Sequence, residues 1–377
     1  MIKVWNYIKE FENEKDEIYE AITDVLTSGC LVFGKNLEKF ENDFSHYCGS
    51  SRGIGVGSCT DAIFIALKSM DVGEGDEVIT VSNTAVPTVA AIHATGATTR
   101  FVDIRTDNYL MDVEKLEDEI SDKTKCIVCV HLYGQCVDMD AVNSLAKKYN
   151  LLVLEDCAQA HGSTYKGRKA GSLSDVSAFS FYPTKVLGAY GDGGMIVTDN
   201  NNLADRIERV RFYGMERKKM SSGHWNGKYY SLEHGYNSRL DELHAAILLN
   251  KLDHLEEYIH RRREIANRYA SGLKDSGLIL PIEDSYNRHV YYVYVVRHPD
   301  RDKIIEELKN RDIHVNISYP WPIHTMQAYR CLGYSESDLP NTELMSQQIF
   351  SLPMYPTLTN EEQDYVIDSL NNIVSSL

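Results

Sequence analysis

The sequence predicts an α/β protein in which a mostly parallel sheet is covered by helices on both faces, with a smaller α+β domain at the carboxyl end. Short apolar runs alternate with segments of helical period, which is the pattern of the βα units that build a parallel sheet. A chain of 377 residues is long for one core and suits a large domain followed by a smaller one. Polar residues directly follow several of the runs, at the edge where open α/β sheets bind ligands.

Charge and composition narrow the classes of function. The chain is 43% hydrophobic and 25% charged, which is typical of a soluble globular protein. Its formal net charge of -16 argues against unassisted binding to DNA, RNA or anionic lipid, because these need clustered Lys and Arg. The start lacks an apolar signal core and no run approaches the length of a membrane span, so we expect a cytoplasmic protein.

The eight cysteines are scattered and form no dense disulfide framework. Cys126 and Cys129 have the spacing of metal ligands, but they fall inside an apolar strand pattern rather than on a loop. We therefore expect buried, inert thiols and no metal site.

The amino-terminal part of the chain predicts two helices followed by a strand and a third helix. Helical spacing of apolar residues runs from 6 to 26 and again from Lys35 to Cys48, on either side of the glycine-flanked segment Ser28–Gly34. A short strand within 53–57 then gives way to Ser58, Cys59 and Thr60 at the start of a helix. Free backbone N–H groups and the helix dipole make such a start a phosphate cradle, although glycine-rich turns before helices are common without a phosphate.

The next 150 residues alternate strands and helices. The predicted strands are Glu77–Val81, Thr99–Ile104, Cys126–His131, Leu151–Leu154, Val176–Phe181 and Met195–Thr198. The predicted helices follow residues 86–88 and cover Val113–Ile120, Asp140–Tyr149 and Leu203–Arg211. From Glu216 to Tyr236 no period is visible, which predicts a long loop.

The carboxyl-terminal part changes in composition and predicts a second domain, giving a large domain over 1–250 and a small domain over 251–377. We predict helices at Lys251–Lys274, Asp302–Arg311 and Glu361–Val374, and strands at Tyr291–Val296 and Val315–Tyr319. The run Arg261, Arg262 and Arg263 on the first of these helices is interpreted as a solvated face.

Asp156 and Lys185 are the candidate catalytic pair, because each follows a buried strand immediately. A lysine placed between Pro183 and glycines at a strand end is partly desolvated, which makes its amine a usable nucleophile. An ionised aspartate nearby suits the ring nitrogen of pyridoxal 5'-phosphate, because it keeps that nitrogen protonated and lets the ring accept electrons. Taken singly, each residue is weak evidence, because a structural loop lysine and a helix-capping aspartate are the more common explanation of such a pair.

Three blocks carry a resemblance to a known family: EDCAQAHG from Glu155 to Gly162, FSFYPTK from Phe179 to Lys185, and GDGG from Gly191 to Gly194. They resemble the nucleotide-sugar aminotransferases of the DegT/DnrJ/EryC1/StrS family, which have the fold-type I, aspartate aminotransferase-like architecture. The resemblance extends from about Leu26 to Pro356.

The resemblance implies a role for each site residue. Lys185 would form the internal aldimine with pyridoxal phosphate, Asp156 would pair with the pyridine nitrogen, and Gln159 would contact the ring hydroxyl. Ala158 would lie against the flat ring. The cofactor phosphate would be bound by Ser180, Ser58, Cys59 and Thr60, and by Asn237 of the neighbouring subunit, which makes the protein a homodimer with shared active sites.

Four segments leave alternatives open. Many relatives place an aromatic residue where this chain has Ala85, so either another side chain covers the cofactor ring or the ring is more open. Ser28–Gly34 either reaches toward an active site, as in the family, or forms a simple interhelical turn. His131–Gln135 either lines the sugar pocket or is a plain buried strand end, and Tyr319–His324 is either a substrate-side turn or a rigid structural loop.

The implied activity is transfer of an amino group from glutamate, which leaves as 2-oxoglutarate, to a nucleotide-linked keto sugar. The His131–Gln135 and Tyr182–Thr184 segments look most like relatives that act on C3 of a dTDP-3-keto-6-deoxyhexose. The alternatives are C4 amination of a GDP- or UDP-linked sugar and amination of a cyclitol ketone. A sugar dehydratase is disfavoured by Lys185, and a regulatory protein by the acidic charge and the lack of a DNA-binding module.

Overall fold

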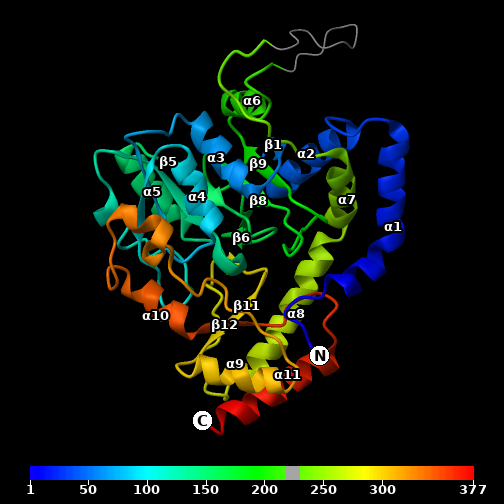
Figure 1. The fold of residues 1–377 in the computed structure, drawn as a ribbon, viewed down its shortest axis with the longest axis vertical. Coiled ribbons are helices and arrows are strands. Elements are labelled where there is room, and N and C mark those ends of the chain that lie inside the picture. The colour runs from blue at the N-terminus through cyan, green and yellow to red at the C-terminus, as the bar shows by residue number, and fades with distance from the viewer. Residues whose placement is uncertain (217–229) are drawn as a thin grey trace.

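Side chains alternate between the two faces of a strand, so a strand that is buried at every position has a layer on each side. Val176–Ser180 and Gly194–Thr198 are buried at all of their positions. The computed structural model, which describes residues 1–216 and 230–377, places both strands inside a seven-stranded sheet with helices on either side (Figure 1).

This sheet has the order β1-β9-β8-β5-β4-β2-β3. Its strands are β1 (Arg52–Val56), β2 (Glu77–Val81), β3 (Thr98–Val102), β4 (Thr124–Val130), β5 (Leu152–Asp156), β8 (Val176–Ser180) and β9 (Gly194–Thr198). Only β9 runs against the others, because it pairs antiparallel with both β1 and β8. The predicted mostly parallel sheet is confirmed.

Helices cover the two faces of the sheet in sets of three. One core cluster contains α2 (Lys35–Cys48), α5 (Met139–Tyr149) and α7 (Glu242–Asp253); the other contains α3 (Cys59–Ser69), α4 (Val86–Ala94) and α6 (Asn201–Val210). Within β5, Val153 packs into the first cluster and the adjacent Leu154 into the second. The alternation along the strand therefore decides which helix layer each residue meets.

A third core cluster lies at the other end of the molecule. It joins α8 (Leu255–Leu273), α9 (Arg301–Asn310) and α11 (Asn360–Val374) to the antiparallel pair β11 (Tyr294–Arg297) and β12 (Ile349–Leu352) (Figure 1). Ile2 contributes to this cluster from the amino end of the chain. The division into 1–250 and 251–377 stays a prediction.

Other elements surround or connect these three clusters. They are α1 (Tyr7–Ser28), α10 (Pro340–Gln348), the three-stranded sheet of β10 (Asn287–Arg288), β6 (Thr164–Tyr165) and β7 (Arg168–Lys169), and the 3-10 turns η1 (Glu117–Glu119), η2 (Leu132–Gly134), η3 (Ile323–Thr325) and η4 (Gln327–Leu332). Among the described helices, none is both long and apolar enough to cross a bilayer.

Two predicted elements are wrong. The segment 113–120 forms successive three-residue turns rather than a helix, since Leu116 bonds back to Val113 and Ile120 to Glu117. Four acidic residues within 114–119 repel one another when wound into one helix, which disfavours it. The segment 315–319 is not a strand: among the described residues it makes only a single bridge, between Asn316 and Ser351, and its last residue, Tyr319, has a φ of 62°, in the left-handed region.

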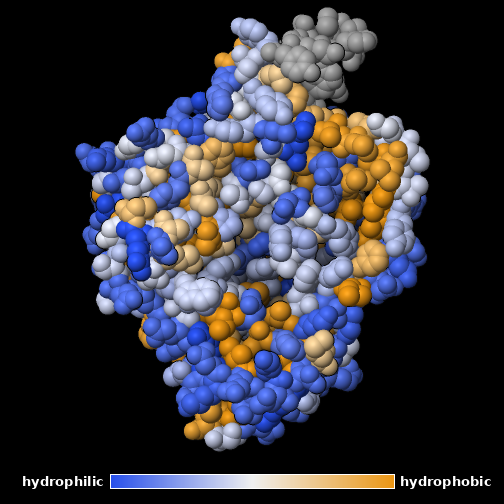
Figure 2. Space-filling view, in the orientation of Figure 1, coloured by the Kyte–Doolittle hydropathy of each residue, from blue (hydrophilic) through white to orange (hydrophobic). Residues whose placement is uncertain are grey.

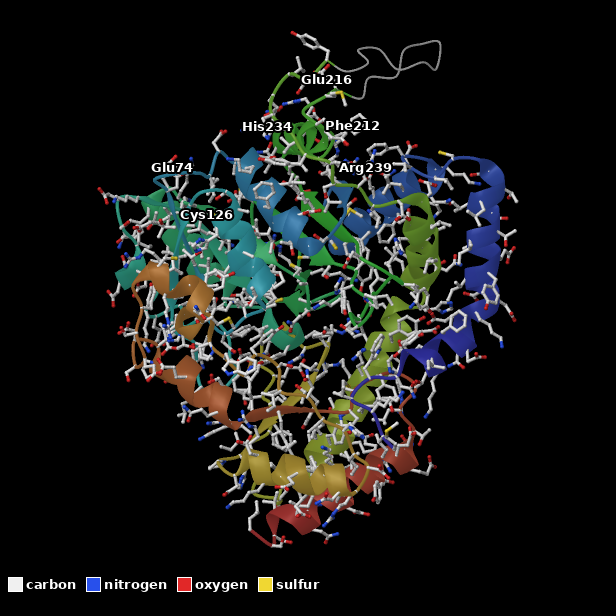
Figure 3. All side chains as sticks on the ribbon, in the orientation of Figure 1. Glu74, Cys126, Phe212, Glu216, His234 and Arg239 are labelled. Atoms are coloured by element: carbon white, nitrogen blue, oxygen red, sulfur yellow. The ribbon has the colours of Figure 1, made fainter. Side chains whose placement is uncertain are left out.

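Two further boundaries differ from the prediction. The helix predicted over 251–274 is divided at His254, where α7 ends and α8 begins. Of the predicted loop from Glu216 to Tyr236, residues 217–229 lie outside the described residues. The two arms of this loop lie side by side, through bridges from Phe212 to Asn237 and from Met215 to Ser231 (Figure 3).

Candidate active site

The acid of the candidate pair is buried at the carboxyl end of β5. Asp156 is the last residue of that strand and is 4% exposed. Its Oδ2 accepts a hydrogen bond of 2.7 Å from the Thr88 hydroxyl, and its Oδ1 accepts one of 3.1 Å from the Ala158 N–H. Thr88 reaches it from the first turn of α4, which starts immediately after Ala85. Two donors therefore fix the orientation of the carboxylate.

The electrostatic balance at Asp156 favours a cationic partner. Burial raises the pKa of Asp156, while the hydrogen bonds from Thr88 and Ala158 and the charge of Lys185 act in the opposite direction. The thiol of Cys59 lies 4.0 Å from Oδ1, and burial together with the negative charge of Asp156 raises the pKa of Cys59, so the thiol stays neutral. A positive group placed against this carboxylate would keep it ionised.

The amine of the pair lies on the turn that follows β8. The Lys185 N–H donates to the Tyr182 carbonyl at 2.9 Å, which closes the turn. The Lys185 Nζ lies 4.6 Å from the centre of the Tyr292 ring, a cation–π arrangement. The Tyr292 hydroxyl shares a 3.0 Å hydrogen bond with Thr184 and so fixes the ring beside the amine. Lys185 and Asp156 are close enough for their charges to interact, as the sequence predicted.

Arg262 supports the wall that carries Tyr292. Its Nη1 donates to the carbonyls of Tyr291, Tyr292 and Met354 at 3.0–3.3 Å, and the residue is 3% exposed. The prediction that the arginine run forms a solvated face is therefore wrong for this residue. In an α-helix only some positions of a three-residue run can face the solvent, and here the middle one points into the protein.

Gln159 has a fixed amide orientation. Its Oε1 accepts a 2.8 Å hydrogen bond from the Tyr133 N–H, so the Nε2 must be the end that faces the site. The Nε2 donates to the hydroxyl of Tyr319. Tyr319 lies on the turn that the sequence marked as rich in proline, which links this turn to the Asp156 block.

The predicted phosphate cradle forms where β9 begins against α3. Ser58 is the N-cap of α3, and its Oγ accepts from the Asp61 N–H at 3.1 Å. A Cβ at Gly194 would meet the Ser58 carbonyl oxygen at 2.4 Å and the Cys59 nitrogen at 2.8 Å, so only glycine permits this approach. Gly194 is also the strand partner of Ser180. Ser58, Cys59 and Ser180 are thereby brought together at the start of a helix.

Asn237 does not complete this cradle within the chain. It is exposed, and within the described part of the chain no hydrogen bond of its side chain to Ser58, Cys59 or Ser180 occurs. Asn237 precedes α7, which is capped by Asp241 and begins at Glu242. Its neighbour Ser238 accepts from the Gly57 N–H at 2.9 Å and so anchors this segment beside the cradle.

The strand end at His131–Gln135 is buried and internally bonded. The Nδ1 of His131 accepts from the Val137 N–H at 3.2 Å, so its proton lies on Nε2, which donates to Glu155 at 2.9 Å. Gln135 binds Asp284 and Ile282 of a neighbouring segment. These contacts favour the interpretation of a buried strand end over that of a sugar-pocket lining.

Cys126 and Cys129 are free thiols buried within β4, which agrees with the predicted burial of these side chains. His131, Glu155 and Cys157 form the group of potential ligands in the described residues. The Glu155 carboxylate already accepts from the N–H groups of Gly171 and Leu173 in addition to His131. We interpret this group as a structural network.

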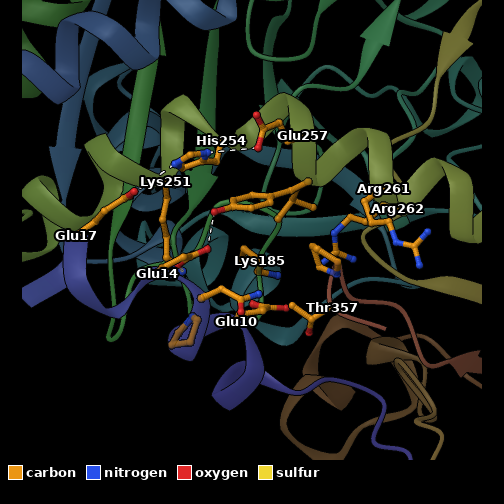
Figure 4. Close-up of a pocket in the computed structure, with 16 residues that line it drawn as sticks. Glu10, Glu14, Glu17, Lys185, Lys251, His254, Glu257, Arg261, Arg262 and Thr357 are labelled. Carbon is orange, nitrogen blue, oxygen red and sulfur yellow. Dashed lines mark hydrogen bonds and ion pairs between the residues drawn. The ribbon is translucent and has the colours of Figure 1, made fainter. Parts of the chain in front are cut away.

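A cavity of about 370 Å³ adjoins Lys185 on the side of α1, α7 and α8 (Figure 4). Glu10 and Glu14 of α1 line it together with Lys251 and Arg262, and the Lys251 Nζ forms an ion pair with Glu14 Oε2 at 3.3 Å. Burial raises the pKa of Glu10, whereas the charges of Arg262 and Lys251 lower it. The cavity gives the amine a polar, partly solvated surrounding that Asp156 lacks.

Sequence reasoning missed Thr88, Tyr292 and Tyr319 as site residues. Thr88 had a signal, since it lies just past the strand end at Val81 and after Pro87 at the start of α4. Tyr292 was assigned to a strand, but β11 begins only at Tyr294 because Tyr291 has a φ of 49°, in the left-handed region. Tyr319 was noted only as part of a turn, and no local pattern shows which residue it contacts.

The sheet is mostly parallel, and it carries an acid and an amine at the carboxyl ends of two adjacent strands. This arrangement is typical of fold-type I enzymes, and comparison with known proteins gives the same class. The model of the DegT/DnrJ/EryC1/StrS aminotransferase family matches residues 12–371. The chain belongs to this family, which confirms the resemblance and the enzyme class predicted from the sequence.

Individual relatives cover the whole chain. The dTDP-3-amino-3,4,6-trideoxy-alpha-D-glucose transaminase of Micromonospora megalomicea subsp. nigra is 49% identical over 379 residues, with 99% of each chain covered. The structure of S. venezuelae DesV in complex with a ketimine intermediate superposes with a TM-score of 0.95 at 37% identity, covering 100% of this chain and 99% of that chain. The PLP form of the putative sugar aminotransferase Spr1654 from Streptococcus pneumoniae has a TM-score of 0.88 at 27% identity, covering 96% of each chain.

Proposed function

We propose that the protein is a pyridoxal phosphate-dependent transaminase that moves the amino group of glutamate onto C3 of a dTDP-3-keto-6-deoxyhexose. The observation that carries the proposal is the convergence of a buried carboxylate, a single amine and a helix N-terminus at one edge of the sheet. The family, and the activity for which the 49% identical relative is named, support the reaction and the position of amination.

The described residues fit the cofactor. Asp156 offers the carboxylate that a protonated ring nitrogen requires, and Gln159 directs an amide N–H into the same space. Ser58, Cys59 and Ser180 present hydroxyl and backbone N–H donors to a phosphate at the start of α3, where the helix dipole favours negative charge. When bound, the cofactor supplies an electron sink for the electrons released at the substrate carbon.

Each residue of the pair has a distinct role in this proposal. With pyridoxal phosphate bound, Lys185 would hold it covalently, and its amine, once freed by the amino donor, would move the proton at the substrate carbon. Asp156 stays ionised against the ring nitrogen throughout. The donor leaves as 2-oxoglutarate before the sugar is aminated, so we expect ping-pong kinetics.

Product analysis tests the proposed function. The purified protein, supplied with pyridoxal phosphate and glutamate, is offered dTDP-3-keto-6-deoxy, dTDP-4-keto-6-deoxy, and UDP- and GDP-linked 4-keto sugars, and the products are analysed by mass spectrometry and NMR. We expect one 2-oxoglutarate for each sugar aminated at C3. Preferential amination at C4, or dehydration without nitrogen transfer, would contradict the proposal.

We also infer a homodimer in which Asn237 completes the phosphate site of the other subunit. Asn237 is exposed beside the cradle, and apolar side chains gather over α1, α2 and α7 (Figure 2). Leu26 on α1, and Leu31 and Val32 in the Ser28–Gly34 segment, are 40–56% exposed. An apolar face of this kind suits a two-fold contact, where each subunit gives and receives the same surface. The Ser28–Gly34 segment would then lie at the interface.

Subunit mixing tests the shared site. Asn237→Ala and Lys185→Ala subunits, each nearly inactive alone, should complement when mixed, because one site of the mixed dimer then has both residues intact. Recovery can reach about half of the wild-type activity per mixed dimer in this symmetric arrangement. If subunits exchange and no activity returns, the two residues serve the same subunit's site.

We infer a cytoplasmic location from the state of the cysteines. All eight are free, including the exposed Cys30 and Cys331, as is usual in a reducing compartment.

A further inference from the structure

The hydroxyl of Tyr319 lies in the candidate active site although Tyr319 belongs to a distant part of the chain. It accepts a hydrogen bond from the Gln159 Nε2, and its ring is parallel to that of Tyr133, at an interplanar angle of 15° and a centroid distance of 6.3 Å. Asp156 and Tyr292 are close enough to act electrostatically on this hydroxyl. Tyr319 therefore faces the same space as the carboxylate and the amine.

The turn that carries Tyr319 is fixed to the end of β2. The Ser82 Oγ accepts from the His324 N–H at 3.0 Å and shares a 2.8 Å hydrogen bond with the His324 Nδ1, and the Ser82 carbonyl accepts from the Ile323 N–H at 3.2 Å. The His324 Nε2 lies 3.2 Å from Glu343 Oε1. Ser82 and His324 are 0% and 1% exposed. These bonds explain the turn as a rigid support that positions Tyr319.

The hydroxyl proton of Tyr319 has no acceptor among the described residues. A tyrosine hydroxyl accepts and donates, and Tyr319 uses only its accepting side, toward Gln159. Among the described residues no acceptor is within hydrogen-bond reach of the Tyr319 proton. Burial raises the pKa of Tyr319, so the hydroxyl keeps this proton across the working range of pH. The Gln159 amide has two hydrogens and can serve Tyr319 and a second acceptor together.

We propose that Tyr319 donates a hydrogen bond to the ring hydroxyl oxygen of pyridoxal phosphate, which it shares with Gln159. The inference rests on the proposed function, because it requires the cofactor ring to lie between Asp156 and Lys185. Gln159 Nε2, Tyr319 Oη and the ring oxygen then form a triangle of hydrogen bonds, with Tyr319 contributed by the carboxyl-terminal part of the chain and Gln159 by the amino-terminal part.

This bond has a spectroscopic consequence. When the ring hydroxyl is ionised, its negative charge raises the pKa of the nitrogen that would join the cofactor to Lys185. A hydrogen bond from Tyr319 to the ring oxygen would reduce this effect, because it stabilises the charge on the oxygen. The pH at which the bound chromophore loses the proton of this nitrogen is therefore lower with Tyr319 than without it.

The test is a pH titration of the absorbance of the purified holoenzyme. Tyr319→Phe keeps the ring and removes the hydroxyl, and we expect the midpoint to rise by about 1 pH unit, the size of one hydrogen bond to a charged group. Tyr294→Phe is the matched control, because the Tyr294 hydroxyl is buried without a hydrogen-bond partner among the described residues and lies on β11. Its midpoint should equal that of the wild type.

The outcomes separate this inference from the proposed function. If the wild type carries no chromophore linked to Lys185, the proposed function fails. If the wild type titrates but the Tyr319→Phe midpoint is unchanged at normal cofactor content, only the role of Tyr319 is refuted. Should Tyr319→Phe not fold, Ser82→Ala, which loosens the turn but keeps the hydroxyl, should raise the midpoint by a fraction of a pH unit; an unchanged midpoint there overturns the inference.

Discussion

The carboxyl ends of β5 and β8 are adjacent in the sheet, yet they hold their polar residues in opposite ways. Asp156 ends β5, is 4% exposed and receives two hydrogen bonds from Thr88 and Ala158. Lys185 follows β8 on a turn, is half-buried, and contacts the face of the Tyr292 ring beside a polar cavity. Within the described residues Lys185 has no ion pair.

This difference fits the two roles in the proposed reaction. A residue that holds one charge against a fixed atom gains from donors that stop it from rotating. A residue that bonds, is released, and then carries a proton between two carbons must change position, so a ring face and a polar cavity suit it better than a directional hydrogen bond. This contrast predicts that activity is lost when Asp156 loses its charge, and when the side chain of Lys185 is shortened so that its amine is removed from the site.

The largest effect is expected from removing the amine. Lys185→Ala should still bind pyridoxal phosphate through Asp156 and the cradle at Ser58, but it should lose the covalent chromophore that borohydride fixes, and turnover should fall by at least about 10³-fold. Absorbance spectra and mass spectrometry after borohydride treatment measure both. A covalent cofactor spectrum that survives in this variant would refute the assignment of Lys185.

The next largest effect is expected at the acid. Asp156→Asn should leave the fold intact but slow the half-reaction with glutamate by about 10²–10⁴-fold, since breaking one partner of a buried pair costs about 3–5 kcal/mol. Stopped-flow absorbance measures the half-reaction. Near-normal rates would show that Asp156 has another role.

Without cofactor the same variant should behave differently. Burial raises the pKa of Asp156, so the folded chain binds this proton more tightly than the unfolded chain. The stability that the proton contributes is present below the unfolded pKa and is lost as the pH rises through the folded pKa. The cofactor-free Asp156→Asn protein should therefore match or exceed the wild type in free energy of unfolding at pH 7, with the difference shrinking toward acidic pH in urea titrations.

The smallest effect is expected from one of the donors to the acid. Thr88→Val keeps the shape but removes a hydrogen bond that lowers the pKa of Asp156, so this pKa should rise. The half-reaction should slow by about tenfold, and its loss on acidification should begin at a higher pH, because the ionised form is the active one. Thr95→Val on the same helix loses a bond to the Ile92 carbonyl instead and should leave this pH profile unchanged.

The positions of most strands could be predicted, because a strand that is buried on both faces is a continuous apolar run bounded by turn residues. The predicted runs at 77–81, 151–154, 176–181 and 195–198 coincide with β2, β5, β8 and β9 within about two residues. The strand β12 (Ile349–Leu352) was missed, although it is buried at all four positions, and 315–319 was chosen in its place. A short apolar run shows burial but not which partner it pairs with.

By itself, the sequence determined the order of strands and helices, and it placed Asp156, Gln159, Ser180 and Lys185 at strand ends, because local periodicity and turn residues encode both. Only the tertiary structure decided that Arg262 points inward, that Asn237 is exposed beside the cradle, and that Tyr319 bonds Gln159. Gln159 and Tyr319 are 160 residues apart. Contacts between residues so far apart in the sequence depend on how whole layers of helices and strands pack. The sequence around Gln159 therefore does not indicate a contact with Tyr319, nor does the sequence around Tyr319 indicate one with Gln159.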